Sequence, residues 1–227
     1  MKSIVILSII IFSLNSAFSQ KIKDISIVLE TGSAHINPSF SIWLEDTLGR
    51  YTETIYVTKS VGTGLYSSAK KVKGRWKSGV KIIEGNLPIW SRRRNISNNR
   101  GGYTPEPNTK EPDAVTGATP IGNTIIHYKY GASDCKKFVI WLEINQSHDF
   151  NEYYPANAYL DELQNTIGQP SLVYAVIIDL RNLVDNYEMI LLGHSNPSGN
   201  SGEIIRSMAE ITTAKNLVSK LEIRITR

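Results

Sequence analysis

The sequence lacks the features that mark disulfide-stabilised, nucleic-acid-binding and metal-binding proteins. It has a single cysteine, Cys135, so an internal disulfide is excluded and the core has to hold the fold without such a crosslink. We interpret Cys135 as a small half-buried residue, because no Cys-His-Asn pattern accompanies it. The net charge is only +4 over 227 residues, which is too small to indicate a nucleic-acid-binding protein. The four histidines show no metal-ligand spacing, so no metal site is predicted.

Long apolar runs are also missing, except at the N-terminus, which has the pattern of a secretory signal peptide. Lys2 supplies the positive charge, residues 4–14 are apolar apart from two serines, and Ala17 and Ser19 are the small residues that a signal peptidase recognises. We therefore predict that residues 1–19 are removed. The alternative is an uncleaved anchor, but the run is short for a spanning helix, which needs about 20 apolar residues.

Removal of this segment defines the mature chain. Residues 20–227 carry 24 basic and 21 acidic side chains, which gives a net charge of about +3. No cysteine follows the apolar segment as a site for lipid attachment, and no later segment is apolar enough to span a bilayer. We expect a periplasmic or secreted protein without direct membrane insertion, whose association with membranes passes through partner proteins.

The mature sequence is dominated by segments in which apolar and polar residues alternate, the pattern of half-buried strands. Eight such segments without a long amphipathic helix predict an all-β fold, a single immunoglobulin-like antiparallel β-sandwich. A short helix is predicted near 157–164, and 203–214 fits either a helix or a strand. The predicted strands are 24–30, 39–45, 51–58, 123–130, 136–144, 171–180, 188–192 and 217–226.

A long insertion at 60–120 interrupts these strands. It is rich in glycine and proline, and it is longer than a loop that only connects two strands. This length indicates a functional or binding loop. Trp76 and Trp90 lie among its many cations. Two interpretations stay open: a surface for an anionic ligand or partner, or a solvated loop that aromatic side chains anchor to the sandwich. The cations are Lys70, Lys71, Lys73, Arg75, Lys77, Lys81, Arg92, Arg93, Arg94 and Arg100.

The sequence Asp-Ala-Val-Thr-Gly-Ala-Thr, which begins at Asp113, is the motif most suggestive of chemistry. Gly117 permits a tight turn, Ala118 leaves room, and the Thr119 hydroxyl would be open to covalent modification. Asp113 would orient or deprotonate that hydroxyl. In the alternative interpretation the motif is only a stable loop, in which Asp113 caps a turn, Thr116 bonds to the backbone and Gly117 supplies a positive φ.

This motif resembles the flavinylation motif of FMN-binding domains in bacterial respiratory complexes. The resemblance implies that a flavin transferase joins the phosphate of FMN to Thr119 as a phosphoester. It also implies that Asp113, Thr116, Gly117 and Ala118 form the recognition turn. The match covers all seven positions of the motif.

A second resemblance extends over most of the mature chain, to a family of periplasmic proteins called domain of unknown function 2271. It implies an immunoglobulin-like fold and a role in flavin-dependent extracytoplasmic electron transfer beside membrane redox proteins. The residues that carry it are 41–46, Gly49, Thr54 with Ile55, 87–90 and 113–122.

From these features we predict an exported accessory protein of flavin-linked electron transfer, with FMN attached at Thr119. Trp90 and Tyr103 would stack on the flavin ring. The alternative is a non-catalytic immunoglobulin-like binding or structural module. An electron carrier or binding protein is favoured over a stand-alone enzyme, and no catalytic residue is assigned. A serine hydrolase lacks support, since there is no Gly-x-Ser-x-Gly motif and Ser195 cannot use its neighbour His194 as a base.

Overall fold

The computed structural model describes residues 22–131, 136–157 and 164–227. The predicted signal peptide and Cys135 lie outside the described residues. So does most of the short helix predicted at 157–164; within its described end, a 3₁₀ turn begins at Gln164. Among the described residues, no helix has the length and apolar character needed to cross a membrane.

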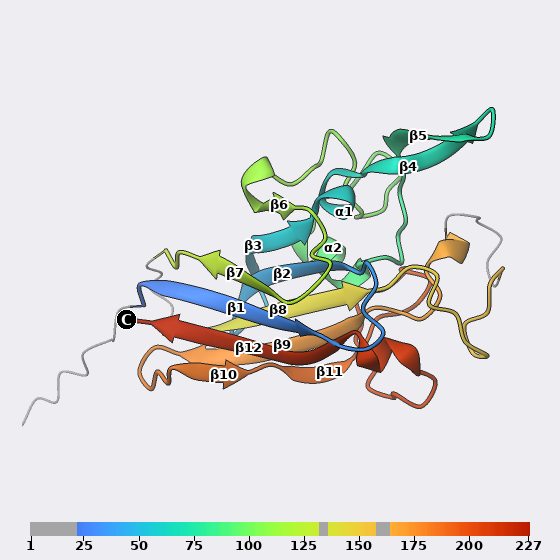
Figure 1. Ribbon diagram of the computed structural model, residues 1–227. Helices are drawn as coiled ribbons and strands as arrows, with labels where there is room; N and C mark the ends of the chain where they lie inside the picture. Colours follow the sequence, from blue (N-terminus) through green and yellow to red (C-terminus); the bar gives the residue numbers. More distant parts are fainter. Residues whose placement is uncertain (1–21, 132–135, 158–163) are drawn as a thin grey trace, which may run out of the picture.

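Two sheets face each other and form an all-β sandwich (Figure 1). Their pairings are antiparallel, apart from a short parallel contact between Val57–Thr58 and Thr116–Gly117. This confirms the predicted fold class, while the immunoglobulin-like detail stays a prediction. The four-stranded sheet has the order β10 (Asn186–Glu188), β12 (Val218–Thr226), β1 (Asp24–Thr31) and β7 (Thr124–Tyr128). The six-stranded sheet has the order β11 (Ile190–His194), β9 (Leu172–Asp179), β8 (Lys137–Asn145), β2 (Ser39–Asp46), β3 (Tyr51–Thr58) and β6 (Thr116–Gly117).

The main core lies between the two sheets and follows from the alternation of apolar residues along the strands. In β1, Ile25, Ile27 and Leu29 are buried, and β8 contributes four buried apolar side chains in the same alternating way. All eight predicted strands are present. The segment predicted at 188–192 is two strands, β10 and β11, which belong to different sheets.

The six-stranded sheet is buried on its outer face as well. There Trp43 of β2, Val57 of β3 and Val173 of β9 form a second apolar cluster with Ile89 and Trp90 from the insertion. Strand β2 is consequently buried from its second to its seventh residue. The insertion therefore adds a layer over the sandwich and positions the loops described below.

The segment 60–120 is more ordered than the predicted loop. It contains α1 (Lys59–Thr63), β4 (Leu65–Val72), β5 (Arg75–Val80), α2 (Pro88–Arg94) and a 3₁₀ turn, η1 (Asp113–Val115). Strands β4 and β5 form a separate hairpin that projects from the sandwich (Figure 1). The segment 203–214 forms neither a helix nor a strand along most of its length. Ile205 makes an isolated bridge to His194, and the 3₁₀ turn η3 (Thr213–Asn216) begins near its end.

Candidate functional site

A cleft of about 610 Å³ lies at the junction between the sandwich and the insertion. Its volume falls within the range that small-molecule and cofactor sites occupy. One wall is formed by Gly117, Ala118 and Thr119 of the predicted motif. Among the residues opposite and beside it are Tyr66 on β4 and Lys81, just after β5. The structure therefore brings the end of the motif together with the base of the hairpin.

The backbone of the motif is fixed by strand β3. Residues Thr116 and Gly117 form β6, which pairs in parallel with β3, and the Tyr56 hydroxyl donates a 2.7 Å hydrogen bond to the Ala118 carbonyl. Gly117 lies against the Tyr56 ring, because a Cβ built there would stand 2.5 Å from the ring atom Cε2. Its φ is not positive, so the expectation of a left-handed glycine was wrong. The glycine is needed for a close approach to an aromatic ring.

The two threonines of the motif have different environments. The Thr116 hydroxyl donates a 3.4 Å hydrogen bond to the Asp113 carbonyl, as a turn-forming residue does. The Thr119 hydroxyl has no hydrogen-bond partner in the described part of the chain, is partly exposed and lines the cleft. Of the two, Thr119 is the residue open to modification.

Asp113 does not support the role of a base. It is exposed, it does not line the cleft, and only its backbone carbonyl contacts the motif. It lies in the 3₁₀ turn that precedes β6. The carboxylate is thus available to a partner protein that recognises the turn, and nothing in the geometry directs it at Thr119.

Tyr66 and Lys81 give the cleft its electrostatic character. The Lys81 Nζ atom lies 5.7 Å from the centres of the Tyr66 and Trp76 rings. Partial burial lowers the pKa of Lys81, and burial raises the pKa of Tyr66 to about 12. At neutral pH the phenol is therefore an uncharged donor beside a cation. This pair of groups suits a planar polar ligand that carries negative charge.

Trp90 does not fit the stacking role expected for it. The side chain is fully buried in the cluster under α2, and its Nε1–H donates a 3.0 Å hydrogen bond to Thr54 Oγ1. Tyr103 packs instead on the Arg92 guanidinium, at 5.0 Å from the ring centre, and does not line the cleft. Trp90 is an aromatic anchor, as the second interpretation of the insertion proposed, whereas Trp76 is exposed.

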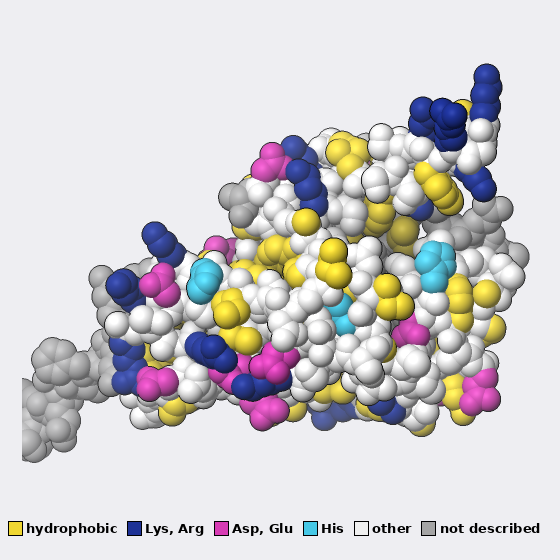
Figure 2. All heavy atoms as spheres, viewed as in Figure 1, with side chains coloured by type: hydrophobic (Ala, Val, Ile, Leu, Met, Phe, Trp, Pro, Cys, Tyr) yellow, Lys and Arg dark blue, Asp and Glu magenta, His cyan; other side chains and the backbone are white. Residues whose placement is uncertain are grey.

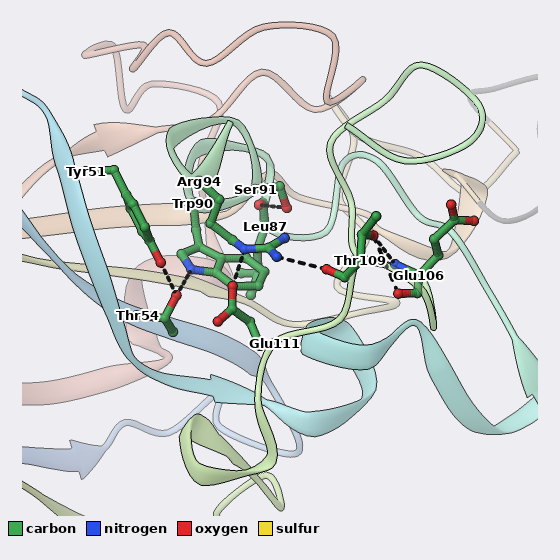
Figure 3. A network of polar contacts seen from close by, with 9 residues as sticks. All are labelled: Tyr51, Thr54, Leu87, Trp90, Ser91, Arg94, Glu106, Thr109 and Glu111. Atoms are coloured by element: carbon green, nitrogen blue, oxygen red, sulfur yellow. Dashed lines mark hydrogen bonds and ion pairs between the residues drawn. The ribbon is translucent and has the colours of Figure 1, made fainter. Parts of the chain in front are cut away.

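The three consecutive arginines make internal contacts with different parts of the chain. Arg92 donates two hydrogen bonds, of 3.1 and 2.9 Å, to the Gly199 carbonyl. Arg93 lies 3.6 Å from the buried carboxylate of Glu45. Arg94 forms an ion pair with Glu111, as Figure 3 shows. None of the three lines the 610 Å³ cleft, so they do not form its anion-binding group.

His148 and His194 lie in different surroundings. His148 lines the cleft beside the motif, whereas His194 is buried, with its ring nitrogens 2.8 and 3.0 Å from the Ser195 and Ser207 carbonyls. Ser195 is fully buried, which leaves a serine hydrolase at this position without access for a substrate. Across the residues that the structure describes, no three metal-ligating side chains form a cluster.

Sequence reasoning missed Tyr66 and His148 as residues of this site, and it named Lys81 only among the cations of the insertion. The basic, aromatic composition of the segment was a signal for Tyr66. The position of His148 carried no comparable signal, because the loop after β8 reaches the motif only in the folded chain.

Gly117→Ala is expected to lower the free energy of unfolding by about 1–3 kcal/mol, since the added methyl group would displace the Tyr56 ring and weaken its bond to Ala118. Urea unfolding followed by fluorescence measures the change. Gly122→Ala is the matched control, because a Cβ at Gly122 meets no atom within 4 Å and its φ is not positive. Equal unfolding midpoints for the two variants would contradict the close packing.

Comparisons with protein-family models, with curated proteins and with solved structures find no match for this chain.

Proposed function

We propose that the chain is an exported accessory protein of flavin-linked extracytoplasmic electron transfer, which carries FMN covalently at Thr119. One observation supports this proposal: Thr119 lines a cleft of about 610 Å³. Its hydroxyl has no hydrogen-bond partner among the residues that the structure describes. The neighbouring Thr116, in contrast, is engaged by its own turn. The resemblance of the motif to flavinylation sites supplies the identity of the group.

The residues of the cleft fit an FMN group in their chemistry. FMN supplies one- and two-electron redox chemistry, and the protein sets its orientation and the charge around it. Lys81 provides positive charge next to the cleft, and Tyr66 provides an apolar face with a protonated hydroxyl. Ala118 leaves room beside Thr119, since its side chain is small and exposed. The volume and the positive charge of the cleft thus agree with an anionic ligand of the size of FMN.

Attachment requires an activated donor. The bond that forms joins Thr119 Oγ to the phosphorus of FMN, and the hydroxyl proton is released. With FAD as the donor, the diphosphate bond breaks and AMP leaves, so atoms and charge balance. A flavin transferase is the proposed partner for this step, and membrane redox proteins are the proposed electron-transfer partners. In this proposal the sandwich is immunoglobulin-like and the mature chain is periplasmic or secreted.

The second candidate is a non-catalytic binding module, in which the motif only shapes a ligand loop. It is favoured by the firm anchoring of the motif, through β6 and the bond from Tyr56 to Ala118, which would serve a non-covalent ligand as well. The two candidates differ in one measurable respect, since only the first forms a covalent bond to flavin.

Co-expression with a flavin transferase tests the proposal. We expect an FMN-sized mass increase and in-gel fluorescence for the wild type, complete loss of both in Thr119→Ala, and retention in Thr116→Ala. A known flavinylated domain expressed in the same cells shows that the transferase is competent. If that domain is labelled and the wild-type chain is not, the carrier function is wrong and the binding module remains. If Thr119→Ala keeps the label, the attachment site is wrong.

A further inference from the structure

The β4–β5 hairpin is a surface that the proposed function does not use in full. A two-residue turn, Lys73 and Gly74, connects the strands, and both residues have positive φ, at 50° and 76°, as tight hairpins require. The hairpin projects away from the sandwich in Figure 1, and Figure 2 shows Lys and Arg side chains gathered at that end of the molecule. Nearly all of its residues are exposed.

The charge of the hairpin is of one sign. It carries five cations, and no acidic residue occurs between Lys59 and Glu84 in the sequence. Lys70 stands directly opposite Lys77 across the two strands, a like-charge pair that destabilises a hairpin. Within the described parts of the chain, none of the hairpin cations forms an ion pair. The fold therefore maintains a positive potential here that it does not need for its own stability.

Apolar side chains accompany these charges near the turn. Val72 is 40% exposed and Trp76 is 60% exposed, on opposite strands next to Lys73 and Gly74. A two-stranded hairpin without a covering layer is only marginally stable in water. An exposed tryptophan at its tip is therefore more readily explained by an external partner than by folding.

We propose that this hairpin binds the surface of an anionic lipid bilayer, with Trp76 and Val72 at the level of the headgroups. Four of its five cations are lysines, which are depleted in protein–protein interfaces but act well as point charges toward lipid phosphates. Tryptophan is enriched at the membrane–water interface, and lysine stems lie along apolar surface while their ammonium groups stay in water. These preferences favour a bilayer over an acidic protein.

This mode of binding is peripheral and needs no spanning helix. It differs from the expectation, drawn from the sequence, that membrane association passes through a partner protein. The base of the hairpin, at residues 65–68, lines the cleft next to Thr119, so binding through the tip would hold the cleft near the membrane surface. The inference itself rests on the hairpin and stands whether or not FMN is attached.

Vesicle co-sedimentation of the mature chain tests the inference. We expect binding to vesicles that contain phosphatidylglycerol, little binding to phosphatidylcholine alone, and weakening as salt is added. A variant with Lys70→Gln, Lys71→Gln and Lys77→Gln should bind about a hundredfold more weakly, given the usual contribution of each cation near an anionic surface. The matched control removes three exposed lysines elsewhere, through Lys110→Gln, Lys129→Gln and Lys215→Gln, and should bind like the wild type.

Tryptophan fluorescence gives a second readout. Trp43 and Trp90 are fully buried, and Trp141 is partly buried and stacked on Trp43. A blue shift on adding phosphatidylglycerol vesicles should therefore come chiefly from the exposed Trp76 and disappear in Trp76→Ala. Failure to bind these vesicles, or equal weakening in the two triple variants, would overturn the inference. Hairpin-dependent binding to polyglutamate without binding to vesicles would also overturn it and would assign the surface to an acidic protein.

Discussion

Arg94→Met is expected to lower the free energy of unfolding by about 3–5 kcal/mol, because it would leave a carboxylate inside the insertion without its counter-charge. The side chain of Arg94 is only 1% exposed and that of its ion-pair partner Glu111 is 10% exposed. Removal of one member of a buried pair leaves the other charge desolvated and uncompensated. Urea unfolding of the variant and the wild type, under identical conditions, measures the difference.

Arg94 also holds separate parts of the insertion together. It donates a 2.9 Å hydrogen bond to the Thr109 carbonyl, and its guanidinium lies 5.1 Å from the centre of the Trp90 ring. Figure 3 shows these contacts converging from α2 and from the loop that leads to the motif. Arg94→Lys should recover only part of the stability. An ammonium group cannot reproduce the several donors of the planar guanidinium or its contact with the Trp90 ring.

Two further variants test whether the loss of stability comes from the unpaired buried charge or from the loss of any arginine. Arg94→Met combined with Glu111→Leu should recover most of the lost stability, because no charge then stays buried alone. Arg50→Met should leave the unfolding midpoint nearly unchanged, since the Arg50 side chain is 75% exposed and its ion pair with Asp46 is screened by water. A combined variant as unstable as Arg94→Met would contradict the explanation.

The sandwich was predictable from sequence because its strands obey a local rule. In β1 and β12 the apolar residues alternate, and each strand buries one face. Strand β2 departs from this rule, since both of its faces are covered, and the cover comes from α2 in the insertion. Helix α2 itself spans only 7 residues, too few for a helical period to stand out from the sequence.

Only the wall of the cleft that the motif forms could be predicted from the sequence. The hydroxyl of Thr119 and the glycine before it are features of one short motif, which the sequence displays directly. The opposite wall depends on contacts between distant residues, such as those that bring Tyr66 and His148 to the same cleft. The burial of Trp90 could not be predicted from neighbouring residues either, because the side chain in α2 bonds to Thr54 on β3, which is distant in the sequence.

The stability of the protein is expected to fall by about 3 kcal/mol as the pH rises from 4.5 to well above 7, owing to Glu143. Glu143 is fully buried in β8, and burial raises its pKa from 4.5 to about 7. The folded chain thus binds a proton more tightly than the unfolded chain does. The stabilisation is complete below pH 4.5 and is lost as the pH rises through 7, which urea midpoints at successive pH values would show.

The surroundings of Glu143 can accommodate both protonation states. The carboxylate accepts hydrogen bonds from the backbone of Ile89 at 3.2 Å, the backbone of Trp90 at 2.8 Å and the Ser171 hydroxyl at 2.5 Å. Ser171 also lies 2.7 Å from the Ser195 hydroxyl. When Glu143 is protonated, it can donate to Ser171, which then donates to Ser195. The neutral acid therefore keeps its hydrogen bond with the Ser171 hydroxyl.

Substitutions at and beside Glu143 test the assignment of this pH dependence. The loss of stability between pH 4.5 and 7 should be much smaller in Glu143→Gln, which cannot titrate. Glu45, whose pKa burial also raises, contributes with the same sign in both proteins and cancels in the comparison. Ser171→Ala removes a bond that favours the ionised form, so the pKa of Glu143 should rise and the loss of stability should extend to higher pH. Parallel profiles for the wild type and Glu143→Gln would show that Glu143 does not cause the effect.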